Sequence, residues 1–113
     1  MDPLRIDPTE IVERLRLRGE DWADKNAAAE LLEETKSTLL ATIATQSMRD
    51  GASAAKAELE AKATEAYADH LEKMVEARRH ANRARVAYDS GRVFAELLRT
   101  KAATERSQME LSR

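Results

Sequence analysis

From residue 53 to residue 113 the chain has no proline, and small or apolar residues recur at alternating spacings of three and four. This spacing matches one narrow heptad stripe along an α-helix. The pattern predicts one long helix over residues 53–112 that packs against another helix along a seam. The predicted seam contains mainly small side chains: Ala63, Ala66, His70, Met74, Ala77, Ala81, Ala84, Tyr88, Gly91, Ala95, Leu98, Ala102, Glu105 and Met109.

The middle of this seam is the predicted contact with a companion helix, in the same hairpin or in another chain. Its members are Met74, Ala77, Ala81, Ala84, Tyr88, Ala95 and Leu98. Bulkier residues are expected to widen the seam in places: Leu59, Tyr67, Leu71, Val75, Phe94 and Leu97. Because alanine removes little apolar surface from water, either the companion helix supplies the bulk or the region is marginally stable alone.

The first half of the chain has its own helix signals. Asp7 can accept hydrogen bonds from free amides at a helix start, and Pro8 suits the first helical position. We predict a short helix over residues 8–18, a break at Gly19 and a second helix over residues 21–49. The alternative is one continuous helix that carries Gly19 at a cost of about 1 kcal/mol. Residues Leu4 and Ile6 are expected to pack back onto the first turns.

The second predicted helix has a seam of its own, formed by Ala28, Leu32, Thr35, Leu39, Ile43 and Gln46. Asp50 and Gly51 are expected to end it, and Ser53 is expected to cap the long helix. Such a short turn makes two long helices antiparallel neighbours. The expected fold is therefore all-α: a long antiparallel helical hairpin of coiled-coil type with a short N-terminal helix, in one domain of 113 residues that self-associates.

Composition narrows the class of protein. Alanine and charged residues dominate, with 35% Asp, Glu, Lys and Arg, which is typical of long helices. The chain has no cysteine, so disulfides and thiol chemistry are excluded. The first residues do not resemble a signal peptide, and the longest uncharged run, residues 37–48, is too short to cross a bilayer. We expect a soluble protein of the cytoplasm, without a membrane partner.

Charge is unevenly distributed along the chain. Residues 1–76 contain 10 Lys and Arg against 17 Asp and Glu, a net charge of −7, whereas residues 77–113 contain 9 against 4, a net charge of +5. In an antiparallel hairpin these halves would lie along each other. The simplest interpretation is electrostatic complementarity between neighbouring helices, within the chain or between subunits.

Arginines recur every seven residues beside the long seam, at positions 78, 85, 92, 99 and 106. The candidate binding residues in this region are Arg78, Arg79, Arg83, Arg85, Arg92 and Arg99. Arginine suits two-point contact with phosphate or carboxylate. One interpretation is a surface for the backbone of a nucleic acid; the other is pairing with acidic residues of a neighbouring helix.

No constellation of residues favours catalysis. His70 and His80 would lie about 15 Å apart on one helix, too far to share a metal ion, and neither belongs to a metal-binding spacing. The chain has no Gly-x-Ser-x-Gly elbow, phosphate-binding loop or dinucleotide fingerprint. We therefore expect no enzymatic activity, no metal site and no cofactor.

Part of the long helix resembles small helical proteins encoded by tailed phages and prophages. The resemblance covers roughly residues 64–110 and depends on Tyr67, His70, Leu71, Ala77, Arg78, Arg83, Arg85, Tyr88, Phe94, Arg99, Thr100, Glu105, Arg106 and Met109. It implies a phage accessory protein close to replication or recombination, and it implies no catalytic residue. The expected role is an oligomeric coiled-coil scaffold or adaptor with a protein partner, and the alternative is accessory nucleic-acid binding through the arginines.

Overall fold

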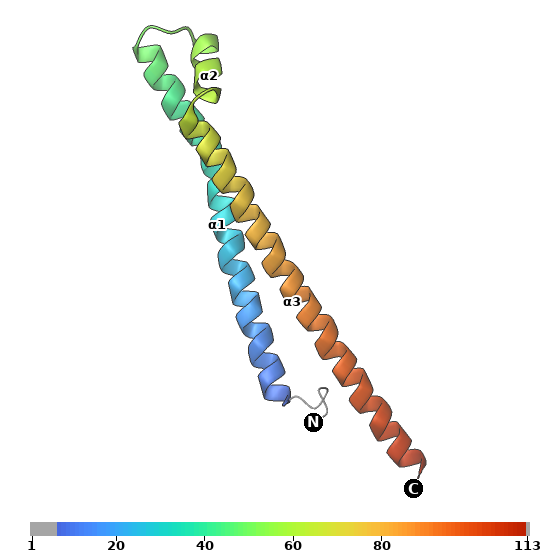
Figure 1. Cartoon of the computed structure of the whole chain (residues 1–113). Helices are drawn as coiled ribbons and strands as arrows, with labels where there is room; N and C mark the ends of the chain where they lie inside the picture. The colour runs from blue at the N-terminus through green and yellow to red at the C-terminus, as the bar shows by residue number, and fades with distance from the viewer. Residues whose placement is uncertain (1–6, 113) are drawn as a thin grey trace. The chain divides into compact units, whose positions relative to one another are not determined.

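The computed structural model describes residues 7–112, which form three helices in chain order (Figure 1). They are α1 (Pro8–Arg49), α2 (Ala54–Lys62) and α3 (Glu65–Leu111). No strand occurs within these described residues. The prediction of an all-α helical hairpin is confirmed, whereas the predicted packing of Leu4 and Ile6 lies outside the described residues.

The chain divides into two compact units, and both α1 and α3 contribute to each of them. One unit contains Met1–Trp22 and Arg83–Arg113, and the other contains Ala23–Asn82. In each unit the α1 and α3 segments run antiparallel. In the second unit, His70 contacts Leu32 whereas Arg78, further along α3, contacts the earlier residue Asn26.

The first helix is continuous, so the predicted break at Gly19 and the separate helix over residues 8–18 are wrong. Asp7 caps α1 as expected, since its Oδ1 accepts a hydrogen bond from the Thr9 amide at 2.9 Å. Arg16 forms an ion pair with Glu13, one turn before it, and another with Glu20, one turn after it, at 2.6 Å. These pairs connect the helical turns on both sides of Gly19. One glycine costs about 1 kcal/mol in a helix, too little to end a helix supported on both sides.

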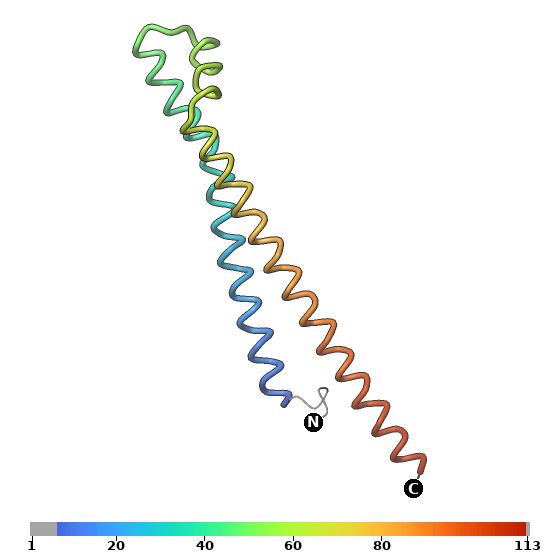
Figure 2. The backbone as a smooth tube through the Cα atoms, in the orientation of Figure 1, coloured from blue at the N-terminus to red at the C-terminus, as the bar shows by residue number. Residues whose placement is uncertain are grey.

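The turn after α1 forms as predicted, and Figure 2 traces the reversal of the chain there. Gly51 has a φ of 103°, which a residue with a side chain rarely adopts. The Gly51 amide donates to the Met48 carbonyl at 3.1 Å, and the Ala52 amide donates to the Ser47 carbonyl at 3.0 Å. This pair of bonds is the Schellman motif that satisfies the last carbonyls of a helix.

The predicted long helix over residues 53–112 is wrong in one respect, because it is interrupted at Ala63 and Thr64. Ser53 is an N-cap as expected, accepting from the Lys56 amide at 3.3 Å, but the helix that it caps is the short α2 and not the long helix. Thr64 then caps α3: its Oγ1 accepts from the Tyr67 amide at 3.2 Å and donates to the Ala61 carbonyl at 2.7 Å. One hydroxyl thus satisfies both an amide at the start of α3 and a carbonyl at the end of α2.

The core of the described residues is narrow and consists of alanine. The buried positions are Ala29, Ala57, Ala61, Ala81 and Ala84, and no large side chain among the described residues is fully buried. On α1 the predicted seam is correct at Leu32, Leu39 and Ile43, which are half-buried. It is wrong by one position at Ala28, which is exposed while its neighbour Ala29 is buried.

Candidate functional site

The predicted seam of α3 lies on the side of the helix that contacts α1. Ala81 and Ala84 are buried, and the other five candidates of the central seam are half-buried: Met74, Ala77, Tyr88, Ala95 and Leu98. The two ends of the longer predicted seam differ from this. Ala63 and Ala66 are exposed because the break at Thr64 changes the helical phase, and Ala102, Glu105 and Met109 are exposed as well.

Tyr88 is the centre of the contact between α1 and α3 in the first unit. Its ring lies 5.7 Å from the Trp22 ring, centroid to centroid, with a tilt of 30° between the two planes. A Cβ atom added to Gly19 would lie 3.4 Å from the Tyr88 ring, an ordinary van der Waals distance, so the ring lies directly beside this turn of α1. On the outer side, the Arg92 guanidinium lies 5.8 Å from the ring centroid, within the range of a cation–π contact.

Among the described residues, Arg78 is the one candidate arginine that forms an ion pair between helices. Its Nε and one terminal nitrogen donate to the two Glu33 carboxylate oxygens at 2.8 and 2.9 Å, and the other nitrogen donates to Asn26 Oδ1 at 2.8 Å. Both side chains are about one-third exposed, at 34% for Arg78 and 38% for Glu33. The Arg78 hydrogen bonds lower the pKa of Glu33, and Glu33 raises the pKa of Arg78.

The other candidate arginines remain on the surface. Arg79 pairs with Glu76 at 3.4 Å and Arg92 pairs with Asp89 at 3.6 Å, in both cases one turn away on the same helix. Within residues 7–112, Arg83, Arg85 and Arg99 are exposed and make no ion pair or side-chain hydrogen bond. Arg78 therefore has a structural role, whereas the other five candidate arginines keep their charge at the surface, where a partner can reach it.

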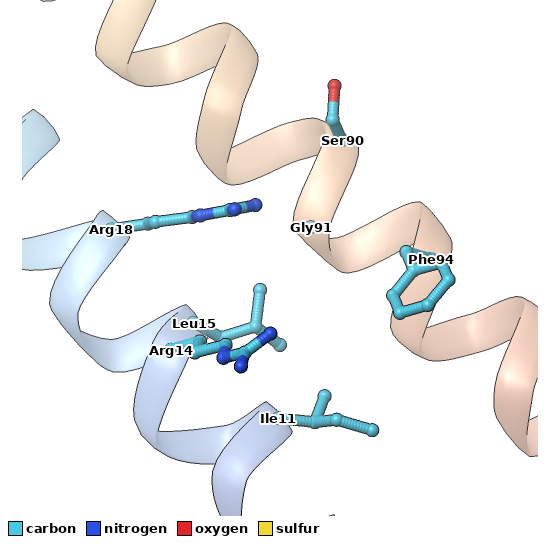
Figure 3. A pocket seen from close by; sticks show the side chains of 7 residues that line it. All are labelled: Ile11, Arg14, Leu15, Arg18, Ser90, Gly91 and Phe94. Atoms are coloured by element: carbon cyan, nitrogen blue, oxygen red, sulfur yellow. The ribbon is translucent and has the colours of Figure 1, made fainter. Parts of the chain in front are cut away.

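An apolar groove lies between the beginning of α1 and the second half of α3 (Figure 3). Its volume is about 230 Å³, and its apolar lining comes mainly from Ile11, Leu15 and Phe94. Gly91 forms part of the floor, because a Cβ atom there would lie 3.0 Å from Leu15 Cδ2. Arg14 and Arg18 also line it, and Arg18 donates to the Ala87 carbonyl at 3.2 Å. The sequence did not single out this groove, because it depends on which α1 turn lies beside Gly91.

The two histidines have separate surroundings. His70 Nε2 lies 2.7 Å from the Leu32 carbonyl oxygen and so links α3 to α1. His80 is exposed, with its Nε2 3.1 Å from Glu76 on the same helix. Among the residues that the structure describes, no group of three or more His, Asp or Glu side chains is arranged to hold a metal ion.

Several large apolar side chains of α3 point away from α1, which corrects part of the sequence prediction. Tyr67 and Leu71 are half-buried, as expected of residues that widen the seam. Val75 and Leu97 do not widen it, because they are 57% and 63% exposed. Leu59, which lies on α2 rather than on α3, is 71% exposed and does not widen it either. A heptad seam in a two-helix contact covers only part of a helix, so residues on the far side stay in water.

Comparison of the chain with protein-family models, with curated proteins and with solved structures finds no match. The resemblance to small phage-encoded helical proteins therefore stays a prediction. In residues 7–112, no helix combines the length and the apolar character that a membrane crossing requires.

Proposed function

We propose that the protein is a non-enzymatic helical hairpin that self-associates and serves as a scaffold or adaptor for other proteins. The observation that supports it is the core. The buried residues within the described range are five alanines, whereas large apolar side chains such as Val12, Leu31 and Val86 are 59–67% exposed. Each large apolar side chain gains about 1.5–3 kcal/mol when it leaves water, so the hairpin retains much of its apolar surface for association.

The total exposed surface supports the same proposal. The chain exposes 8725 Å², whereas a monomeric protein of its mass, 12.7 kDa, exposes about 6,200 Å² by the usual scaling with mass. The excess is about 2,500 Å². Obligate interfaces bury about 2,000–5,000 Å² in total, or about 1,000–2,500 Å² on each chain, so the excess corresponds to a large interface or to more than one partner surface.

Sedimentation equilibrium over low to high micromolar concentrations tests the proposal. We expect a mass above that of the single 12.7 kDa chain, with dissociation on dilution. A single 12.7 kDa species throughout this range would contradict self-association. The adaptor role is tested next, by measuring whether any partner binds the assembled form more tightly than the dissociated form.

The second candidate function is accessory binding of nucleic acid, and it is supported by the exposed, unpaired state of Arg85 and Arg99 within the described residues. Such binding would depend on phosphate charge and would weaken steeply with salt. We expect the variant with Arg85→Glu and Arg99→Glu to lose affinity for single-stranded and duplex DNA at low salt. Lys56→Glu combined with Lys62→Glu is the control, because it makes the same change of charge at two exposed lysines of α2 that are not among the candidate arginines. Absence of binding by the unaltered protein at low salt would exclude this function.

A further inference from the structure

The far side of α3 carries a second stripe with heptad spacing that has no companion within the described chain. Its positions follow one another at spacings of four and three and are all uncharged: Val86, Ser90, Val93, Leu97, Thr100, Thr104, Ser107 and Leu111. In a chain with 35% charged residues, eight successive uncharged positions on one helical face indicate a contact surface. We refer to these eight residues as the outer stripe.

Every residue of the outer stripe is exposed in the structure. Its four large apolar members are Val86, Val93, Leu97 and Leu111, with exposures of 59%, 55%, 63% and 88%. These side chains lie on the side of α3 opposite to Ala84, Tyr88 and Ala95, so the contact with α1 cannot cover them. No other part of residues 7–112 covers them, so they are available to another chain.

The last turns of α3 also have no companion helix among residues 7–112. Ile11, near the start of α1, lines the same groove as Phe94 (Figure 3). Further along α3, all residues over 102–112 are exposed. Because most helical stability in proteins comes from the packing of one face, this exposed end of α3 is a surface on which a partner can pack.

We propose that the outer stripe binds the outer stripe of a second copy of this chain, as a parallel and in-register two-stranded coiled coil. The charges beside the stripe indicate both the partner and its direction. One flank carries Asp89, Glu96 and Glu110, and the other carries Phe94, Lys101 and Gln108. In a parallel pair each flank faces the opposite flank of the partner, whereas in an antiparallel pair like flanks face each other.

The parallel arrangement brings Glu96 of each chain beside Lys101 of the other. The antiparallel arrangement would place the two acidic flanks together, which is unfavourable. Lys101 already pairs with Glu105 at 2.9 Å on its own helix, but such exposed pairs contribute little and exchange readily. The arginine row lies between the inner seam and the acidic flank, so the dimer leaves Arg85 and Arg99 open to a further partner.

This inference rests on the proposed self-association, and it adds the surface and the orientation. Because the chain has no cysteine, a single introduced cysteine can form a disulfide only with its own copy in another chain. The positions that cross-link therefore report the contact surface and the relative orientation of the two helices. We expect Val86→Cys and Thr104→Cys each to form an intermolecular disulfide on mild oxidation. The two positions are separated by about 27 Å along a helix at 1.5 Å per residue, so an antiparallel pair could bring only one of them next to its own copy. Arg85→Cys is the control that should not cross-link efficiently.

A substitution tests the same surface independently of oxidation. Leu97→Glu should raise the dissociation constant of the dimer at least about tenfold, with unchanged helix content because Leu97 is exposed in the single chain. Arg99→Glu is the matched control outside the stripe.

If sedimentation shows only monomer, the proposed function and this inference both fail. A stable oligomer without cross-linking at either cysteine, or one unaffected by Leu97→Glu, overturns the outer stripe alone. Cross-linking at one cysteine only overturns the parallel orientation.

Discussion

Gly19 has the Tyr88 ring directly beside it, and the available space allows one more carbon atom. A Cβ atom there would meet Tyr88 Cε2 at 3.4 Å, an ordinary van der Waals contact. Alanine is a better helix former than glycine by about 1 kcal/mol. We therefore expect Gly19→Ala to raise the free energy of unfolding by about 0.5–1 kcal/mol, measured by urea denaturation.

Gly51→Ala is the contrasting control for this prediction. The φ of 103° at Gly51 strains any residue with a side chain, although nothing lies within 4 Å of the added atom. We expect a loss of about 1–2 kcal/mol there. A loss of stability in Gly19→Ala would show that α1 and Tyr88 lie closer together than the structure indicates.

Glu33 makes the stability of the second unit depend on pH. Its bonds with Arg78 lower the pKa of the carboxyl below the usual value of 4.5, so the unfolded chain binds the proton more readily than the folded chain. The stabilisation is therefore present at neutral pH and is lost as the pH falls through the lowered pKa of Glu33. We expect Glu33→Gln to be less stable than the unaltered protein at neutral pH.

Unfolding curves at several pH values measure this effect. The difference between Glu33→Gln and the unaltered protein should shrink on acidification and disappear below the pKa of Glu33 in the folded state. Glu34→Gln is the control, because Glu34 is exposed and does not take part in the contact with Arg78. A constant difference across the pH range would mean that the Glu33 charge is not the cause.

At the scale of elements, the break between α2 and α3 depends on Thr64. The signal was present in the sequence, since a threonine followed by Glu65 is a typical helix start. The residues around Thr64 continue a helical pattern without proline or glycine, so periodicity alone predicts an uninterrupted helix. The hydrogen bonds of the Thr64 hydroxyl, to Tyr67 and to Ala61, favour the break over a continuous helix.

We expect Thr64→Ala to reduce the free energy of unfolding by about 1 kcal/mol, the usual loss for an N-cap hydroxyl. Thr42→Ala is the control, because the Thr42 hydroxyl donates to the Thr38 carbonyl in mid-helix and caps nothing. Thermal unfolding followed by circular dichroism measures both. Equal stability of the two variants would mean that Thr64 does not cap α3.

At the scale of the whole molecule, the alanine core makes stability depend on association. A hairpin that buries five alanines within its described residues gains little from its own packing. If the chain self-associates as proposed, its thermal midpoint should rise with protein concentration by mass action. Differential scanning calorimetry over a wide concentration range measures the rise. A midpoint that does not change with concentration would indicate that the single chain is stable by itself.

Local chemistry was enough to predict the helix class, the cap at Asp7, the turn at Gly51 and the cap at Ser53, because each depends on neighbouring residues. The heptad spacing was enough to identify the part of α3 around Ala81 and Ala84 that contacts α1. Heptad spacing does not, however, show how wide the contact with the other helix is, and Leu97 was predicted to widen the seam although it lies on the far side of α3.

The remaining features depend on residues far apart in the chain. Gly19 lies inside a continuous helix with the Tyr88 ring beside it, and the pair with Glu33 makes Arg78 structural whereas Arg85 stays exposed. Spacing along one helix contains no information on which turn of another helix lies opposite. That register follows from the packing of whole side chains, so only the folded chain shows which charges are paired and which apolar stripe remains for a partner.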